Sequence, residues 1–182
     1  MPRPQPDILI FVYILFLFLC ISNFSVYKVM VMFFDLLWQV VLDVMSHFGF
    51  ADGASRDTQN LSSAAWVLHY PSGQLLVSRG VCIGPASNNV AEYTAVIHLL
   101  SEAISLGVDS LVVFLDSQLV VSQLNNTYRV RDPSLLRLFL RVRLLQRSFQ
   151  FLTFIHIPRA DNWFADSLAN QALDWHINHS IQ

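Results

Sequence analysis

The stretch Leu111–Val121, LVVFLDSQLVV, predicts a buried strand that ends in a carboxylate. Its first five residues carry no polar side chain and are too few for a helix, so they are typical of a strand buried on both faces. Asp116 follows at the carboxyl end, where ligands collect in open α/β sheets. With Ser117 and Gln118 beside it, this acid could bind a hard cation. The alternative is that Asp116 or Ser117 only caps the next helix.

Strand and helix patterns alternate on both sides of this stretch. Strands are predicted at 46–51, 64–70, 74–81, 111–115 and 149–157. Helices are predicted after Ser87, Ser117 and Asp132, and a last helix spans Asp161–Trp175. The order of three strands, helix, strand, two helices, strand and helix is typical of an α/β domain with a mixed sheet. We assign this domain to residues 45–178.

Residues 1–44 form a separate hydrophobic segment. Ile8–Tyr27 contains no charged residue and just reaches the ~20 residues that cross a bilayer. Arg3 and Lys28 lie on opposite sides of it, so the positive-inside rule gives no orientation. Three interpretations stay open: a membrane anchor through residues 8–27, a signal peptide, and a passive extension translated from upstream sequence.

The overall composition excludes some classes of protein. The 182 residues hold 11 Lys and Arg against 13 Asp and Glu, a formal net charge of −2, so no global basic field attracts nucleic acid. Such a partner would have to be bound by a local patch. Cys20 and Cys82 are the two cysteines, which excludes a disulfide framework and a zinc site built mainly on thiolates. Nucleus, cytoplasm and a membrane-associated location all stay open.

Four acids stand at or near the ends of predicted elements. They are Asp52 after the first strand, Glu92 in the first turn of the first helix, Asp116 after the central strand, and Asp166 in the last helix. Each one alone has a structural explanation. Asp52 could be a turn residue, Glu92 could favour the helix dipole, and Asp166 could be a solvated helix position.

Together, the sequences around these acids resemble the ribonuclease H family. The matching pieces, in chain order, are FADGAS, SNNVAEYTAV, LVVFLDSQLVV and HIPRADNWFADSLAN, and they cover about residues 46–175. The chain is most similar to type 1 members of the retroelement, plant or archaeal-like branch, which lacks the basic handle of some bacterial members. The resemblance implies a ribonuclease H-like fold, a five-stranded mixed sheet flanked by helices.

The resemblance also implies an activity and its metal. The expected enzyme is a Mg²⁺-dependent endonuclease that hydrolyses the RNA strand of RNA–DNA hybrids, leaving a 5′-phosphate and a 3′-hydroxyl. Two divalent ions ~3.5–4 Å apart can activate water and stabilise the leaving oxygen, and carboxylates are the ligands they prefer. Asp52 and Asp116 would share two Mg²⁺ ions, with Glu92 on one and Asp166 on the other. Mn²⁺ is the alternative metal.

Further residues are assigned to the substrate by the same resemblance. They are Asn88, Asn89, Gln118, Arg159 and Asn162. Asn88 and Asn89 match positions that contact the nucleic-acid backbone and minor groove, although they could also cap a helix. Arg159 and Asn162 match loop-positioning or phosphate-contacting residues. His156 is either an auxiliary catalytic residue or a structural residue at a strand end. Hybrid recognition would rest on 2′-hydroxyls and helix shape.

An arginine cluster between residues 129 and 147 is opposed only by Asp132. Its members are Arg129, Arg131, Arg137, Arg141, Arg143 and Arg147. The cluster is either a solvated helix face or a patch that follows phosphates.

Two other functions stay open for the chain, which we expect to be a monomer. One is a catalytically inactive, nucleic-acid-binding ribonuclease H-like domain of retroelement origin, whose altered loop at 55–60 no longer seats substrate. The other is a membrane-anchored protein whose sequons at Asn23, Asn60, Asn125 and Asn178 would be glycosylated in a secretory lumen.

Overall fold

The computed structural model describes residue 31 and residues 46–179. The chain divides into two units, 1–43 and 44–182. The hydrophobic stretch 8–27 and the sequon at Asn23 lie outside the described residues, so the predictions made for them stay predictions. Within the described part of the chain, no helix combines the length and the apolar composition needed to cross a bilayer.

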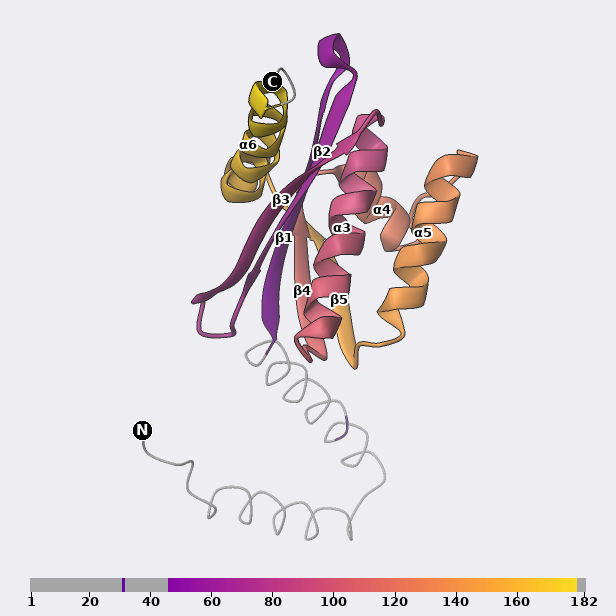
Figure 1. The fold of residues 1–182 in the computed structure, drawn as a ribbon. Coiled ribbons are helices and arrows are strands. Elements are labelled where there is room, and N and C mark those ends of the chain that lie inside the picture. The colour runs from indigo at the N-terminus through magenta and orange to yellow at the C-terminus, as the bar shows by residue number, and fades with distance from the viewer. Residues whose placement is uncertain (1–30, 32–45, 180–182) are drawn as a thin grey trace, which may run out of the picture. The chain divides into compact units, whose positions relative to one another are not determined.

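A five-stranded mixed sheet forms the centre of the second unit, in the order β3-β2-β1-β4-β5 (Figure 1). The strands are β1 (His47–Arg56), β2 (Leu61–His69), β3 (Leu75–Gly84), β4 (Ser110–Leu115) and β5 (Phe151–His156). β2 pairs antiparallel with β1 and β3, whereas β4 pairs parallel with β1 and β5. The predicted five-stranded mixed sheet is therefore confirmed.

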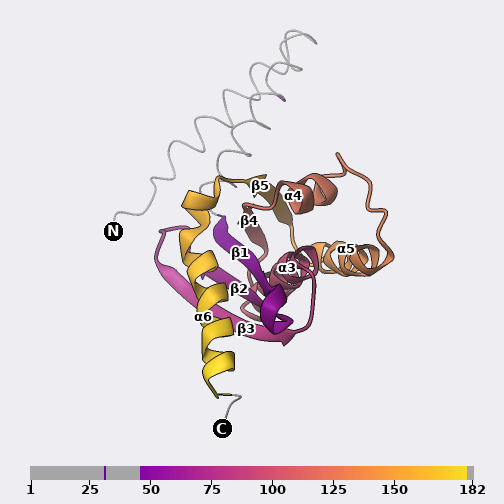
Figure 2. The same cartoon turned by 90° about the horizontal axis from the view of Figure 1, so that it is seen from above.

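Helices cover both faces of this sheet, as Figures 1 and 2 show. α3 (Asn88–Ser105), α4 (Gln118–Leu124) and α5 (Pro133–Gln146) lie on one face, and α6 (Trp163–His179) lies on the other. α3 packs on β1 and β2, and α5 packs on α3 as an outer layer. Two short 3-10 turns, η1 (Asp57–Gln59) and η2 (Arg159–Asn162), connect β1 to β2 and β5 to α6.

The boundaries of α3 follow from its capping residues. Ser87 accepts a hydrogen bond from the backbone N–H of Val90, which satisfies one free donor of the first turn. At the other end Gly107 has φ +74°, and the N–H of Val108 bonds the carbonyl of Ala103. This is the Schellman arrangement, which glycine allows without strain. The two caps fix α3 in register against β1.

The first strand is longer than the sequence predicted. Asp52-Gly53 was expected to end it in a turn, but β1 continues to Arg56, with Asp52 opposite Ala65 and Gly53 opposite Ala64. The turn comes at η1, where Asn60 has φ +49°. Gly53 marks close packing instead, because a Cβ at this position would lie 2.2 Å from the backbone nitrogen of Glu92.

Replacing Gly53 with alanine should strongly destabilise the domain, because the obstructing atoms belong to the α3 backbone and cannot move aside. We expect Gly53→Ala to lower the free energy of unfolding by about 3 kcal/mol or more. The matched control is Gly73→Ala, where φ is +82° but no atom lies within 4 Å of the added Cβ, so the cost should be about 1 kcal/mol. Urea unfolding measures the free energy of unfolding of both variants. Equal decreases in the two variants would contradict the close packing of α3 on β1.

Candidate active site

The candidate site lies where β4 separates from β1. The parallel pairing of these strands runs from His47 opposite Leu111 to Phe50 opposite Phe114 and then stops. Asp52 lies two residues further along β1, and Asp116 is the first residue after β4. Asp116 therefore lies at the carboxyl end of β4, and Asp52 lies in the middle of β1, just beyond its parallel pairing with β4. In α/β sheets ligand crevices form at the carboxyl ends of parallel strands.

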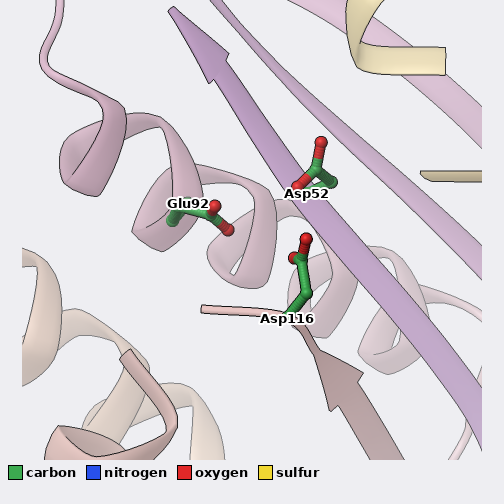
Figure 3. Close-up of side chains that lie close together, drawn as sticks. All are labelled: Asp52, Glu92 and Asp116. Carbon is green, nitrogen blue, oxygen red and sulfur yellow. The ribbon is translucent and has the colours of Figure 1, made fainter. Parts of the chain in front are cut away.

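Three carboxylates converge at this point (Figure 3). Asp52 comes from β1, Asp116 from the end of β4, and Glu92 from α3. Each offers an oxygen within 4.8 Å of the others. We call these three residues the acidic triad. They line a pocket of about 190 Å³ together with residues of β1, η2 and α6.

The acidic triad is poorly solvated. Asp52 is 4% exposed and Glu92 is 5% exposed, while Asp116 is half-buried. Burial raises the pKa of Asp52 to about 7, and the negative charges of Asp116 and Asp166 contribute to the increase. Burial raises the pKa of Glu92 to about 9, with further contributions from Asp52 and Asp116. Three acids this close cannot all be ionised without compensation.

The residues present fit a divalent cation. Carboxylate oxygens are the ligands that Mg²⁺ and Mn²⁺ prefer. One oxygen of Glu92, Oε2, is buried and has no hydrogen-bond partner in the described part of the chain. An orphaned, buried carboxylate oxygen is costly unless a positive charge or a donor meets it. A cation among the three acids would remove that cost and their mutual repulsion.

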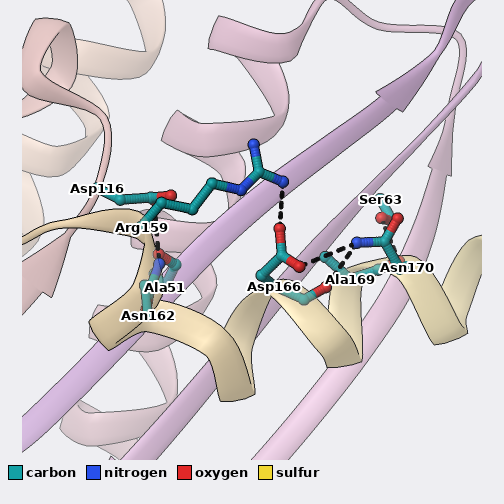
Figure 4. Close-up of polar contacts among 8 residues, drawn as sticks. All are labelled: Ala51, Ser63, Asp116, Arg159, Asn162, Asp166, Ala169 and Asn170. Atoms are coloured by element: carbon teal, nitrogen blue, oxygen red, sulfur yellow. Dashed lines mark hydrogen bonds and ion pairs between the residues drawn. The ribbon is translucent and has the colours of Figure 1, made fainter.

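Asp116 is held in place by Asn162 (Figure 4). Asn162 lies in η2 and is 1% exposed. Its Nδ2 donates to Oδ1 of Asp116 at 3.1 Å and to the carbonyl oxygen of Ala51 at 3.0 Å. The amide thus ties the end of β4 to the middle of β1. Ser117, and not Asp116, caps α4 by accepting from the N–H of Val120, which leaves the Asp116 carboxylate for the triad.

Asp166 is not part of the acidic triad. Its carboxylate pairs with Arg159 and accepts a hydrogen bond from Nδ2 of Asn170 (Figure 4). It is still close enough for its charge to contribute to the raised pKa of Asp52. The structure therefore brings three of the four predicted metal ligands together, with the fourth engaged by a cation of the protein itself.

The other predicted site residues surround the triad at different depths. Asn88 and Arg159 are exposed and line the pocket. Asn89 is half-buried at the start of α3, and Gln118 is exposed at the start of α4. Nε2 of His156 lies 3.2 Å from the carbonyl oxygen of Asp116.

The position of Glu92 differs from the sequence prediction, and one residue of the pocket, Asn170, was not predicted. Glu92 lies one residue beyond the first turn of α3, which contains no acid, so the helix dipole does not explain it. Asn170 lines the pocket, and its Nδ2 also bonds the carbonyl of Asp166 at 2.9 Å. The spacing of four residues from Asp166 along a helix could have indicated Asn170.

Comparison with known proteins gives a consistent result. Residues 50–172 match the reverse transcriptase-like family. Ribonuclease HI of Halobacterium salinarum is 42% identical over 123 residues, which are 68% of this chain and 62% of that protein. A bifunctional protein of Mycobacterium tuberculosis is 36% identical over 127 residues, 68% of this chain and 34% of that protein. The chain thus spans less than two thirds of the length of these relatives.

Solved structures match over nearly their whole length. The crystal structure of RNase H1 from Halobacterium salinarum has a TM-score of 0.69 and 40% identity, covering 71% of this chain and 98% of that one. LC11-RNase H1, solved in complex with an RNA/DNA hybrid, has a TM-score of 0.68 and 30% identity, covering 72% and 99%. The matched part of this chain therefore has counterparts that fold without another segment. This chain belongs to the ribonuclease H family.

The raised pKa of Asp52 predicts that the metal-free domain loses stability as pH rises. The folded state holds a proton on Asp52 up to about pH 7, whereas the unfolded state releases it near pH 4, so ionisation opposes folding between these values. In chelator at about pH 8, Asp52→Asn should raise the free energy of unfolding by about 1–3 kcal/mol.

Thermal melts of both proteins in chelator test this prediction. The difference between Asp52→Asn and the unaltered protein should vanish below about pH 4, where Asp52 is protonated in both states. His47, His69 and His98, whose pKa values are lowered by burial, are present in both proteins and cancel. Asp57→Asn, at an exposed acid of η1, is the control and should change nothing. If Asp52→Asn and the unaltered protein were equally stable at every pH, burial of the ionised Asp52 carboxylate would not destabilise the domain.

Proposed function

We propose that this chain is a Mg²⁺-dependent endonuclease that hydrolyses the RNA strand of RNA–DNA hybrids. The observation that carries the proposal is the acidic triad, in which Asp52 and Glu92 are buried with raised pKa values and Glu92 has an orphaned oxygen. Burial and mutual repulsion make such a triad destabilising unless it binds a cation. The family relationship and the similarity to an RNase H1 solved with an RNA/DNA hybrid support the choice of substrate.

The triad residues would hold the metal, and neighbouring residues would orient them. Asp52, Glu92 and Asp116 are the ligands, and Mn²⁺ could replace Mg²⁺. Asn162 fixes the Asp116 carboxylate towards β1, so that this ligand need not be ordered when the cation binds. When bound, the divalent ion supplies Lewis-acid stabilisation of the charge that develops during phosphodiester hydrolysis.

Two ions require a fourth ligand, which we assign to Asp166. Its negative charge already acts on Asp52, so it lies near the same centre. Its present partner, Arg159, is exposed, and a second cation in place of Arg159 would keep the carboxylate neutralised. Arg159 would then be free to contact a phosphate of the substrate, which a guanidinium group binds well.

Substrate would approach along the open side of the pocket. Asn88 and Arg159 are exposed at this opening and present amide and guanidinium donors to a nucleic-acid backbone. Asn89 and Gln118 stand at the starts of α3 and α4. We assign these four residues to the hybrid, and His156, whose ring reaches the backbone of Asp116, to an auxiliary role in the reaction or in product release. None of the six arginines of the 129–147 cluster lines this pocket.

Cleavage of a labelled RNA–DNA hybrid tests the proposal. The purified chain should cut the RNA strand with Mg²⁺ or Mn²⁺ and stop when chelator removes the metal. Asp116→Asn should lower the rate by more than about 100-fold, because it removes a charged metal ligand while leaving the fold in place. Asp57→Asn, the same change at an exposed acid away from the pocket, should cut like the unaltered protein.

Other nucleic acids and the binding step separate the alternatives. Single-stranded RNA and duplex DNA of the same sequence should resist cleavage, because the 2′-hydroxyls and shape of the hybrid are then missing. A folded sample that binds the hybrid in metal but leaves it intact would contradict the proposal. That result would establish instead the inactive nucleic-acid-binding domain that the sequence left open.

A further inference from the structure

The solvent-facing side of α5 carries a row of leucines. Leu136, Leu140 and Leu144 are 40%, 57% and 52% exposed, and their spacing of four residues places them along one face of the helix. The opposite face of α5 is the one that packs inward, through Leu135 and Val142. The exposed leucines are therefore not needed for the core of the domain.

Arginines flank this row, and the charge of one of them, Arg137, acts on Asp132 at the start of the helix. Arg137, Arg141 and Arg147 are exposed, and none of them takes part in an ion pair within residues 46–179. The nearest acid in sequence, Asp132, accepts hydrogen bonds from Ser134 and Leu135 at the start of the helix. We call Leu136, Leu140, Leu144, Arg137, Arg141 and Arg147 the α5 outer face.

Arg143 differs from the other arginines of the helix and does not belong to this face. It is half-buried, donates to the carbonyl of Leu124 and to the side chain of Asn126, and lies over the ring of Phe139. Its role is to attach the end of α4 to α5. Of the six arginines in the 129–147 cluster, Arg143 is therefore structural and the other five are exposed. The choice between a solvated helix face and a patch that follows phosphates stays a prediction.

The α5 outer face is separate from the candidate active site. α5 packs mainly on α3, and Figures 1 and 2 show it on the other side of α3 from β1 and β2. No residue of α5 lines the pocket of the acidic triad. A ligand of this face would therefore not compete directly with metal or substrate at the triad.

We propose that the α5 outer face docks on an anionic lipid surface. Leucines that stand out between arginines match such a surface, because the apolar side chains enter the boundary between headgroups and acyl chains while the guanidinium groups meet lipid phosphates. A nucleic-acid backbone would satisfy the arginines but would gain nothing from the leucines. The same chain also carries Ile8–Tyr27, a stretch without charge that is long enough to cross a bilayer, which favours lipid over an acidic protein as the occupant.

Vesicle sedimentation with residues 45–182 tests the proposal without the stretch 8–27. The probes are phosphatidylcholine vesicles with and without about 30% phosphatidylserine, since each arginine near an anionic surface strengthens binding severalfold. The bound fraction should be at least about 10-fold higher on the anionic vesicles and should fall as salt is added. The full chain, measured in parallel, should show the same dependence on lipid charge.

Paired substitutions identify the surface that binds. Leu140→Gln with Leu144→Gln, and separately Arg137→Gln with Arg141→Gln, should each lower anionic-vesicle binding by about 5-fold or more. Leu75→Gln with Leu106→Gln is the matched control, because these leucines are 45% and 46% exposed elsewhere on the domain. The control pair should bind like the unaltered domain, and thermal melts should show that all variants are folded.

Two results would overturn the proposal. One is equal sedimentation with neutral and anionic vesicles. The other is full anionic binding by the leucine pair, which would show that the arginines attract any polyanion. In that case an RNA–DNA hybrid should displace the vesicles, and the face would be a nucleic-acid contact. Support requires that the leucine pair loses vesicle binding while its hybrid cleavage stays unchanged.

Discussion

The repulsion among three partly desolvated carboxylates is the constraint on which the rest of this structure depends. Asp52, Glu92 and Asp116 come from three different elements and meet within 4.8 Å. Burial and like charge raise the pKa of Asp52 to about 7 and of Glu92 to about 9. These carboxyl groups therefore hold protons at pH values where a bound cation would keep them ionised. A fold keeps such a cluster only when the surrounding residues hold the acids in place. Three features of this domain have that effect.

Each enforcing feature has a simple physical form. Gly53 lets the backbone of α3 approach β1 closely enough to bring Glu92 to the strand, since any Cβ would collide with it. Asn162 ties Asp116 to the backbone of Ala51 and so holds the end of β4 against β1. Arg159 neutralises Asp166 beside the triad. Together they hold the acids close to one another, which is the preorganisation that a metal site needs.

Much of this arrangement could be predicted from the sequence, for identifiable reasons. The run Leu111–Leu115 is apolar throughout, which indicated a central strand, and Ser87 and Gly107 mark the ends of α3 by ordinary capping chemistry. Local sequence patterns did not predict the role of a residue whose main contact is distant in the sequence. The sequence predicts a turn at Gly53 because the contact of this residue, the backbone of Glu92, is far along the chain. No spacing rule reveals that Arg143 is half-buried and structural whereas Arg137 is exposed.

Anomalous diffraction from crystals soaked in Mn²⁺ tests the central claim most directly, because it locates the ion without reference to activity. The account predicts a peak within about 2.0–2.5 Å of carboxylate oxygens from Asp52, Glu92 and Asp116. At higher Mn²⁺ a second peak should lie beside Asp166, with Arg159 displaced from it. A folded crystal that shows no peak among the three acids, or shows the ion bound elsewhere, would contradict the account.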